Sequence, residues 1–217
     1  MSLPKIVTNR CVACGRQSSQ TILASTNRFG SPDLDMRPPE MMRSTMRWWI
    51  QECPHCGYVA EDIGDSCGVA TEWLKSEVYK TCDGRSFKSD LAARFYKNYL
   101  TNLVYGSKRK AFYAALHAAW ACDDAQDVSN AIHCRSCALQ ALDKMTSTPR
   151  VAEELLVVKA DLLRRTERFD NLIEEYQSIR LRSDLLNQII AFEVERAKAN
   201  DTARYTVDDV NRLNSNG

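Results

Sequence analysis

Two CxxCG motifs hold the residues of this sequence whose type and spacing can do chemistry. A CxxC pair in a tight turn supplies two thiolates at the separation that a tetrahedral metal ion needs, and two such turns supply all four ligands. Gly15 and Gly57 follow the pairs at once and permit a left-handed backbone in which amide groups point back at the sulfur atoms. The spacing therefore predicts one structural Zn²⁺ ion bound by Cys11, Cys14, Cys53 and Cys56.

Other cysteine and histidine residues are weighed against this set. A redox dithiol is the alternative for a lone CxxC, but two paired motifs without a βαβ setting favour metal. His55 is a possible substitute ligand, although the middle of a CxxC turn normally points outward. Cys67 lacks a partner and stays unassigned. Cys134 and Cys137 form a third CxxC inside an expected helix, without a following glycine, so we expect buried thiols there.

The chain length and the distribution of proline and glycine residues indicate two modules that position these ligands. The chain has 217 residues with 44% hydrophobic content, enough for one core and a small satellite. Five of the six prolines precede residue 60, and the helix-breaking residues proline and glycine are rare in the rest of the chain. The predicted fold is mainly α, with a small N-terminal β zinc ribbon at 1–65 followed by a helical tetratricopeptide-like bundle at 66–213. Residues 214–217 form an expected frayed tail.

Apolar and β-branched patterning predicts the elements. Residues 20–25 and 45–52, which flank the CxxC motifs, suit short strands. Residues 15–52 separate the two motifs by 38 positions, so this stretch must contain an excursion of its own. Ser89, Asp127 and Ser183 stand where helix N-caps belong. Apolar residues at helical spacing predict helices at 70–81, 89–105, 108–122, 127–145, 150–166, 168–180 and 184–199.

The later helices resemble a repeated helix-turn-helix unit. Apolar side chains line residues 156–163, a turn follows at 167–170, and apolar side chains line 172–179, which resembles a tetratricopeptide repeat. Residues 113–138 match this pattern more loosely. An irregular helical bundle is the alternative, because it buries the same periodic stripe.

Charge and composition restrict the possible partners. The formal charge of +1 gives no global attraction to nucleic acid or to an anionic membrane. The first residues lack the apolar core of a secretory signal, and no apolar run is long enough to span a bilayer. Nine cysteines, an odd number, do not suggest a disulfide framework. We expect a cytoplasmic protein without membrane contact.

One local basic region is a candidate nucleic-acid interface. Residues 80–110 carry eight cations against two acids, interleaved with aromatic side chains. Basic charge attracts phosphates and aromatic rings stack on bases. The alternative, which we favour, is that the aromatic residues form the buried stripe of the 89–105 helix and the cations its solvated face. Trp48 and Trp49 cannot both face inward on one strand, so one of them is either an exposed contact residue or covered by the helical module.

No catalytic motif emerges. The sequence has no HExxH, no phosphate-binding glycine loop and no GxSxG turn, and it has three histidines. A four-thiolate zinc site leaves no open position for a substrate. An enzyme that uses zinc or a thiol is therefore the least favoured hypothesis.

Several segments together resemble an uncharacterised bacterial family, domain of unknown function 2225. The resemblance covers nearly the whole chain and rests on Cys11-Val-Ala-Cys-Gly15, residues 29–39, residues 53–60 and the helix at 118–121. It implies a zinc-ribbon-like segment, tetratricopeptide-like helices and ligand roles for the four cysteines, but no activity. The first motif lacks the proline of the commoner Cys-Pro-x-Cys form.

The leading hypothesis is a non-catalytic, zinc-binding bacterial adaptor. The ribbon is folded by zinc, and the helical layer presents a surface to a protein partner whose identity the sequence does not give. The alternative is a nucleic-acid-binding ribbon assisted by the basic face at 80–110.

Overall fold

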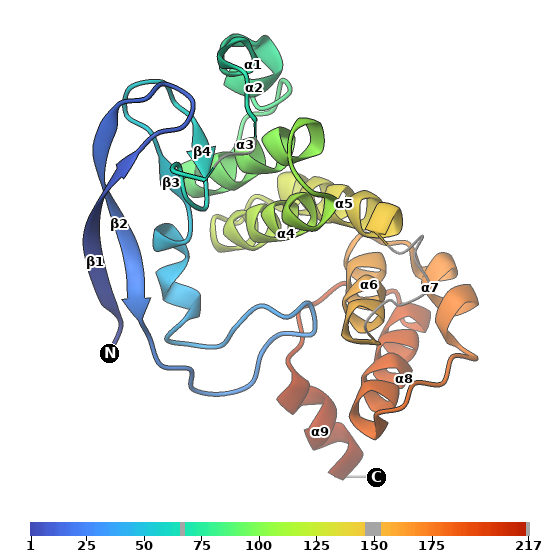
Figure 1. The fold of residues 1–217 in the computed structure, drawn as a ribbon. Coiled ribbons are helices and arrows are strands. Elements are labelled where there is room, and N and C mark those ends of the chain that lie inside the picture. The colour runs from blue at the N-terminus through green and yellow to red at the C-terminus, as the bar shows by residue number, and fades with distance from the viewer. Residues whose placement is uncertain (66–67, 146–152, 216–217) are drawn as a thin grey trace. The chain divides into compact units, whose positions relative to one another are not determined.

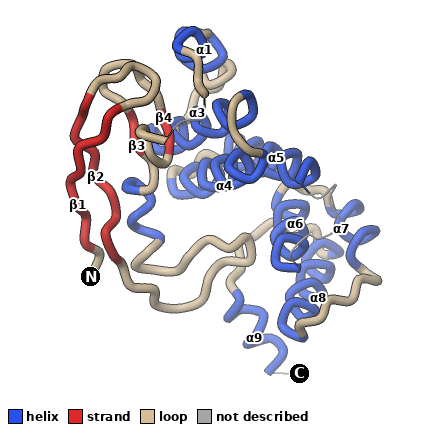
Figure 2. Tube along the Cα trace, in the orientation of Figure 1, coloured by secondary structure: helices blue, strands red, loops and turns tan. Residues whose placement is uncertain are grey.

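The fold is mainly helical, with two small antiparallel hairpins near the N-terminus (Figures 1 and 2). A computed structural model describes residues 1–65, 68–145 and 153–215. These residues form ten helices, one of them a 3₁₀ helix. The two hairpins carry the four cysteines of the CxxCG motifs. The predicted fold class, mainly α with a small N-terminal β module, is confirmed at this level.

The chain divides into two compact units, and each combines segments that are distant in sequence. Unit 1 contains residues 1–27 and 41–141, and unit 2 contains residues 28–40 and 142–217. The hairpins therefore share a compact unit with helices, while part of the stretch between the CxxC pairs belongs to the C-terminal helices. The predicted boundary at residue 65, between the ribbon and the helical bundle, stays a prediction.

The hairpins of unit 1 frame the cysteine turns. Strands β1 (Leu3–Arg10) and β2 (Gln17–Ser25) pair antiparallel, and the short strands β3 (Gln51–Glu52) and β4 (Val59–Ala60) do the same. The strand expected at 20–25 lies within β2.

The strand expected at 45–52 is wrong for most of its length. Residues Arg43–Trp48 form the 3₁₀ helix η1, and the strand is confined to β3. Thr45 explains the difference, because its hydroxyl donates to the Met42 carbonyl at 2.7 Å and accepts from Trp49 Nε1 at 2.9 Å. These local hydrogen bonds compete with the extended backbone that β-branched and aromatic residues favour. Since residues 48 and 49 are not in a strand, the inference that they face opposite sides fails.

The helices of unit 1 follow the predicted periodicity. They are α1 (Thr71–Lys75), α2 (Glu77–Lys80), α3 (Asp90–Val104), α4 (Lys108–Asp124) and α5 (Val128–Met145), the last four residues of which are assigned to unit 2. The helix expected at 70–81 is broken at Ser76, whose side chain accepts from Tyr79 N as the N-cap of α2. Ser89 caps α3 as expected, and the Asp127 carboxylate accepts hydrogen bonds from Asn130 at the start of α5.

The core of unit 1 lies between α3, α4 and α5. Helix α3 packs along α4, and α4 contributes a run of small buried residues between Ala111 and Cys122 that permits this close approach. The aromatic stripe of α3 faces inward, since Phe95, Tyr96 and Tyr99 are buried. The thiols of Cys134 and Cys137 are also buried, as expected for the third CxxC.

Unit 2 is built on α6 (Glu153–Arg165), α7 (Phe169–Tyr176) and α8 (Asp184–Lys198), each of which packs against the other two. Ser183 caps α8 as predicted. Helix α9 (Val207–Ser215) was not among the predicted helices. It takes in two of the four residues expected in a frayed tail, and the other two, 216–217, lie outside the described residues.

Residues 28–40, from the stretch between the CxxC pairs, pack against the C-terminal end of unit 2. Leu34 N donates to the Tyr205 carbonyl and Val207 N donates to the Pro32 carbonyl, both at 3.0 Å. Arg165 Nη1 lies 3.3 Å from Asp35 Oδ2, and that carboxylate is buried. This packing explains why the two CxxC pairs are so far apart in sequence.

A buried charged group joins α6 to α8. The Arg164 side chain has no exposed surface, and its Nε donates to Glu193 Oε2 at 2.5 Å while its Nη2 donates to Asp161 Oδ1 at 2.9 Å. Its Nη1 donates to the carbonyls of Asp201 and Ala203 at 2.9 and 2.7 Å. Two acids thus share one arginine away from water. Burial raises the pKa of Glu193 to about 8, with the Asp161 charge adding to the effect and Arg164 opposing it.

The raised pKa makes the stability of unit 2 dependent on pH. Folded Glu193 keeps its proton to about pH 8, whereas the usual pKa is 4.5, so the folded state binds more protons in this window. The free energy of unfolding should therefore fall as pH rises from 4.5 to 8. Glu193→Gln should remove this contribution, which is on the order of a few kcal/mol at about 1.4 kcal/mol per pKa unit.

Urea denaturation followed by circular dichroism at several pH values checks this prediction. Taking the difference between Glu193→Gln and wild type cancels the titration of groups elsewhere in the chain. A difference that stays constant from pH 5 to pH 8 would contradict a protonated Glu193.

Candidate metal centre

The two CxxCG turns have the same backbone hydrogen bonds. In the first turn, Gly15 N donates to the Cys11 carbonyl at 2.8 Å, and Cys11 N donates to the Arg16 carbonyl at 2.9 Å. In the second turn, Gly57 N donates to Cys53 O and Cys53 N donates to Tyr58 O, both at 2.9 Å. Each turn therefore closes the end of its hairpin and holds two cysteines on one side.

The glycines are needed for their backbone conformation. Gly15 and Gly57 have φ values of 73° and 71°, which side chains rarely permit. A Cβ atom built at either position would meet nothing within 4 Å, so lack of space is not the reason for glycine.

The four sulfur atoms converge in a small cluster. Cys11 Sγ lies 3.7 Å from Cys56 Sγ, Cys14 Sγ lies 3.7 Å from Cys53 Sγ, and all four ligand atoms lie within 4.8 Å of one another. A tetrahedral ion with Zn–S bonds of about 2.3 Å requires sulfur separations of about 3.8 Å. The four cysteines are free rather than disulfide-bonded. The cluster can hold one metal ion, and its donor set is consistent with zinc.

Partial burial opposes ionisation of the thiols, while backbone amides favour it. Burial raises the pKa values of Cys11 and Cys56. Burial also acts on Cys53, but amide groups of His55 and Cys56 donate toward its sulfur and leave its pKa lowered. A cation at the centre of the cluster would stabilise all four thiolates together, because a coordinating thiol is deprotonated by the metal.

Polar side chains link the two hairpins around the cluster. Gln51 is buried, and its Oε1 accepts from Asn9 Nδ2 at 3.0 Å and from Ile63 N at 3.2 Å. Val12 N, inside the first turn, donates to the Ile63 carbonyl at 2.9 Å. These bonds fix one cysteine turn relative to the other.

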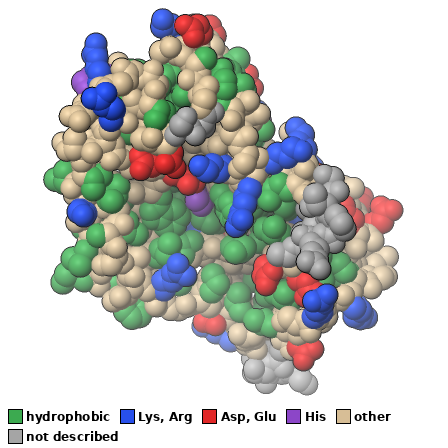
Figure 3. Space-filling view, in the orientation of Figure 1, with side chains coloured by type: hydrophobic (Ala, Val, Ile, Leu, Met, Phe, Trp, Pro, Cys, Tyr) green, Lys and Arg blue, Asp and Glu red, His purple; other side chains and the backbone are tan. Residues whose placement is uncertain are grey.

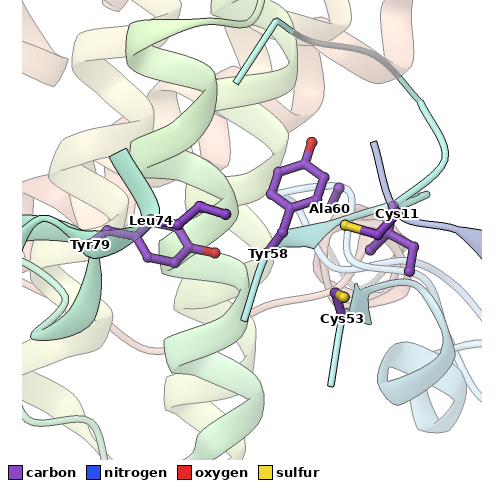
Figure 4. Close-up of a cluster of buried hydrophobic side chains, with 7 residues drawn as sticks. Cys11, Cys53, Tyr58, Ala60, Leu74 and Tyr79 are labelled. Carbon is purple, nitrogen blue, oxygen red and sulfur yellow. The ribbon is translucent and has the colours of Figure 1, made fainter. Parts of the chain in front are cut away.

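Tyr79 connects the second cysteine turn to the helices. Its hydroxyl donates to the Gly57 carbonyl at 2.8 Å and accepts from Val59 N at 3.0 Å, on either side of Tyr58. Figure 4 shows Tyr79 and Leu74, from α2 and α1, on one side of Tyr58, with Cys11 and Cys53 on the other. Burial raises the pKa of the Tyr79 hydroxyl, which keeps it protonated and able to donate. Cysteines and helices thus share one buried cluster.

Tyr79→Phe should destabilise the second hairpin without removing the metal ligands. The substitution leaves the Gly57 carbonyl and the Val59 amide without their buried partner, at a cost of about 1–3 kcal/mol. Amide hydrogen exchange at residues 57–60 should accelerate while metal content is unchanged. Unchanged exchange at these amides would show that the Tyr79 hydroxyl does not hold the turn.

Sequence reasoning missed Tyr79 and Gln51, and no sequence signal marks either residue as part of the site. The other predicted residues lie outside the sulfur cluster. His55 is exposed, with its ring nitrogen Nε2 3.2 Å from the Gln17 carbonyl. Cys67 lies outside the described residues. In the part of the chain that the structure describes, no second group of three or more cysteine, histidine or acidic side chains could hold a metal ion.

The basic region at 80–110 does not offer its central aromatic rings for base stacking. Phe95, Tyr96 and Tyr99 are buried, as the core interpretation of this stripe requires. On the face that Figure 3 shows, Lys and Arg side chains are dispersed among residues of other types. Among the described residues, no helix is long and apolar enough to cross a membrane.

Comparisons with family models, with curated proteins and with solved structures gave no match. The resemblance to the uncharacterised bacterial family therefore stays a prediction that rests on the motifs themselves.

Proposed function

We propose that this chain is a non-catalytic adaptor of the bacterial cytoplasm, in which one structural Zn²⁺ ion folds the ribbon and the helices bind a protein partner. The observation that carries the proposal is the convergence of four thiols in one cluster. Four sulfur ligands fill a tetrahedral ion, whereas catalytic zinc sites keep one position for water or substrate. The site therefore suits folding better than chemistry.

The integration of the cluster with the helices supports a structural role. Cys11 and Cys53 belong to the same buried cluster as Leu74 and Tyr79 of the first two helices. Binding of a metal ion would therefore stabilise the packing of α1 and α2 as well as the hairpins. A metal that is bound only by the folded state contributes its binding free energy to folding.

The helical hairpin formed by α6 and α7 supports a tetratricopeptide-like interaction module. Its facing side chains are buried at Ala160, Leu163, Leu172 and Tyr176, with a short turn at 166–168. Stacked helical hairpins of this kind present extended surfaces to partners. The step from hairpin to partner binding is an analogy between folds.

Affinity capture from a native bacterial lysate, with and without nuclease, tests the adaptor proposal. The expected result is a specific protein partner that is retained after nuclease treatment. The metal content of the purified protein is measured in parallel and should be about one zinc ion per chain. Iron in place of zinc, or capture that nuclease abolishes, would overturn the proposal.

A nucleic-acid-binding ribbon is the second candidate, and the start of α4 favours it. Lys108, Arg109 and Lys110 are exposed in the first turn of this helix, where cations interact unfavourably with the helix dipole. Reversing all three charges should weaken a salt-dependent gel shift if this surface binds phosphates. Binding that is indifferent to those changes would remove this candidate.

A further inference from the structure

An open groove lies along one side of α8 in unit 2, between that helix and the end of α7. It has a volume of about 390 Å³. On α8 it is lined at positions 187, 190, 191, 194 and 198, which form a single stripe at helical spacing. At a rise of 1.5 Å per residue, this stripe is about 16 Å long.

The floor of the groove is apolar, and its walls are fixed. Tyr176, Ile190 and Val194 form the buried part of the floor, and Ala191 is exposed within it. Asn187 holds the α7–α8 connection in place, because its Nδ2 donates to the Leu181 carbonyl at 2.8 Å and its Oδ1 accepts from Leu181 N at 2.8 Å. The groove is therefore built into the helix pair.

The rim of the groove carries positive charge that acidic side chains do not neutralise. Arg180 and Lys198 are the charged residues that line it, and neither forms an ion pair among the described residues. Arg180 Nη1 donates at 2.8 Å to the carbonyl of Ile179, next to it in the chain. Gln177 also lines the groove, and its side-chain amide is exposed. A ligand that complements this rim is acidic.

The shape of the groove favours a peptide over a small molecule. Small-molecule pockets enclose most of the ligand surface, whereas this groove is open and is lined by α8 on one side and by the end of α7 and the connection after it on the other. An elongated apolar floor with a polar rim matches the way in which peptide segments bind to helical surfaces, with spaced apolar anchors and flanking charges.

We propose that the α7–α8 groove binds an acidic peptide segment of a partner protein, with an apolar side chain over Ala191 and carboxylates on Arg180 and Lys198. The proposal rests on the proposed adaptor function and names the class of partner. Charge-assisted hydrogen bonds from the two cations would fix the peptide, and the apolar floor would bury its anchor.

Peptide selection on the full-length, zinc-loaded protein tests this proposal. A display library of random 12-residue peptides is selected, and the most enriched peptide is synthesised with a fluorescent label for anisotropy titration. The expected sequences combine acidic residues with at least one large aliphatic or aromatic residue. Affinity should fall as salt rises, because charge pairs at an open rim are screened.

Variants locate the bound peptide. Arg180→Glu with Lys198→Glu should weaken binding by about tenfold or more, and Ala191→Trp should do the same by filling the groove. The double variant Lys75→Glu with Lys80→Glu, on exposed positions of unit 1, makes the same change in net charge and should bind within about twofold of wild type. Circular dichroism verifies that every variant is folded.

Several results would overturn the groove proposal. These are the absence of any enriched peptide, enriched peptides without acidic residues, and equal binding by the groove variants. Wild-type dimers that Ala191→Trp abolishes would identify a second copy as the occupant instead. A captured lysate partner that binds Ala191→Trp as tightly as wild type would leave the adaptor function standing and remove the groove. Peptide binding in the groove without any captured protein would support the groove and remove the adaptor function.

Discussion

Replacing Cys53 with serine should remove the bound metal, from about one zinc ion per chain to almost none, and should unfold the ribbon. Cys53 is buried, and its sulfur lies 3.7 Å from that of Cys14, so a hydroxyl there leaves the tetrahedron with three thiolates. In zinc-finger peptides the binding free energy of structural zinc is about 10–16 kcal/mol, and it contributes directly to folding. The loss should therefore exceed that from any single core substitution in the hairpins.

Metal analysis and amide hydrogen exchange measure this effect. Exchange should accelerate across residues 8–27 and 41–60, which belong to unit 1, and extend to α1 and α2, because Leu74 and Tyr79 share the cysteine cluster. Exchange in α6 to α8 should change little, since these helices belong to the other compact unit.

Two control substitutions separate ligands from neighbouring residues. His55→Ala changes an exposed residue inside the second turn, and Cys134→Ser removes a buried thiol of the third CxxC. Both variants should keep one zinc ion per chain. Loss of zinc from His55→Ala would contradict the four-cysteine set, and retention of zinc by Cys53→Ser would exclude Cys53 as a ligand.

The sulfur cluster was predictable from sequence because its determinants are local. Each CxxCG turn specifies its own geometry through two cysteines and a glycine, and the structure repeats the same hydrogen bonds in both turns. The buried stripe of α3 was predictable for a similar reason, since apolar periodicity reports which face of a helix is covered. Features of this kind can be predicted without knowing which distant residues pack against them.

The prediction of a strand at 45–52 was wrong because a local hydrogen bond outweighs the strand propensity of these residues. Tryptophan and threonine favour strands on average, but the Thr45 hydroxyl bonds to the Met42 carbonyl and supports a 3₁₀ turn instead. The sequence contains both signals, and pattern alone does not give their relative strength.

The packing of residues 28–40 depends on partners more than a hundred residues away. Asp35 and Arg165 are separated by 130 positions, yet their side chains meet, and the Asp35 carboxylate is buried. Proline and glycine residues are typical of turns, so the sequence predicts an excursion here but does not indicate which residues it packs against. The burial of Asp35 is compensated by hydrogen bonds and an ion pair that only the folded chain provides.

Arg164→Met should destabilise unit 2 by about 3–5 kcal/mol at pH 8, because it leaves the buried acids Asp161 and Glu193 without the guanidinium that both of them contact. Methionine keeps much of the apolar stem, so lost packing contributes less than lost charge. The matched control is Arg182→Met. That side chain is 97% exposed and lies 3.7 Å from Glu153, so its removal should cost at most about 1 kcal/mol.

The pH dependence of the Arg164→Met effect identifies its cause. Without the arginine, Glu193 should hold its proton more strongly, so the destabilisation should be smaller at pH 5 than at pH 8. Adding Glu193→Gln should recover little of the loss at pH 8, because without the arginine Glu193 already holds its proton there and Asp161 keeps the unpaired charge. The four tryptophans lie before residue 121, so far-ultraviolet circular dichroism and hydrogen exchange in α6 and α8 are the suitable probes. An equal loss at both pH values would assign the effect to packing, and Arg164 would then act as a shape-filling residue rather than as the counter-ion of two buried acids.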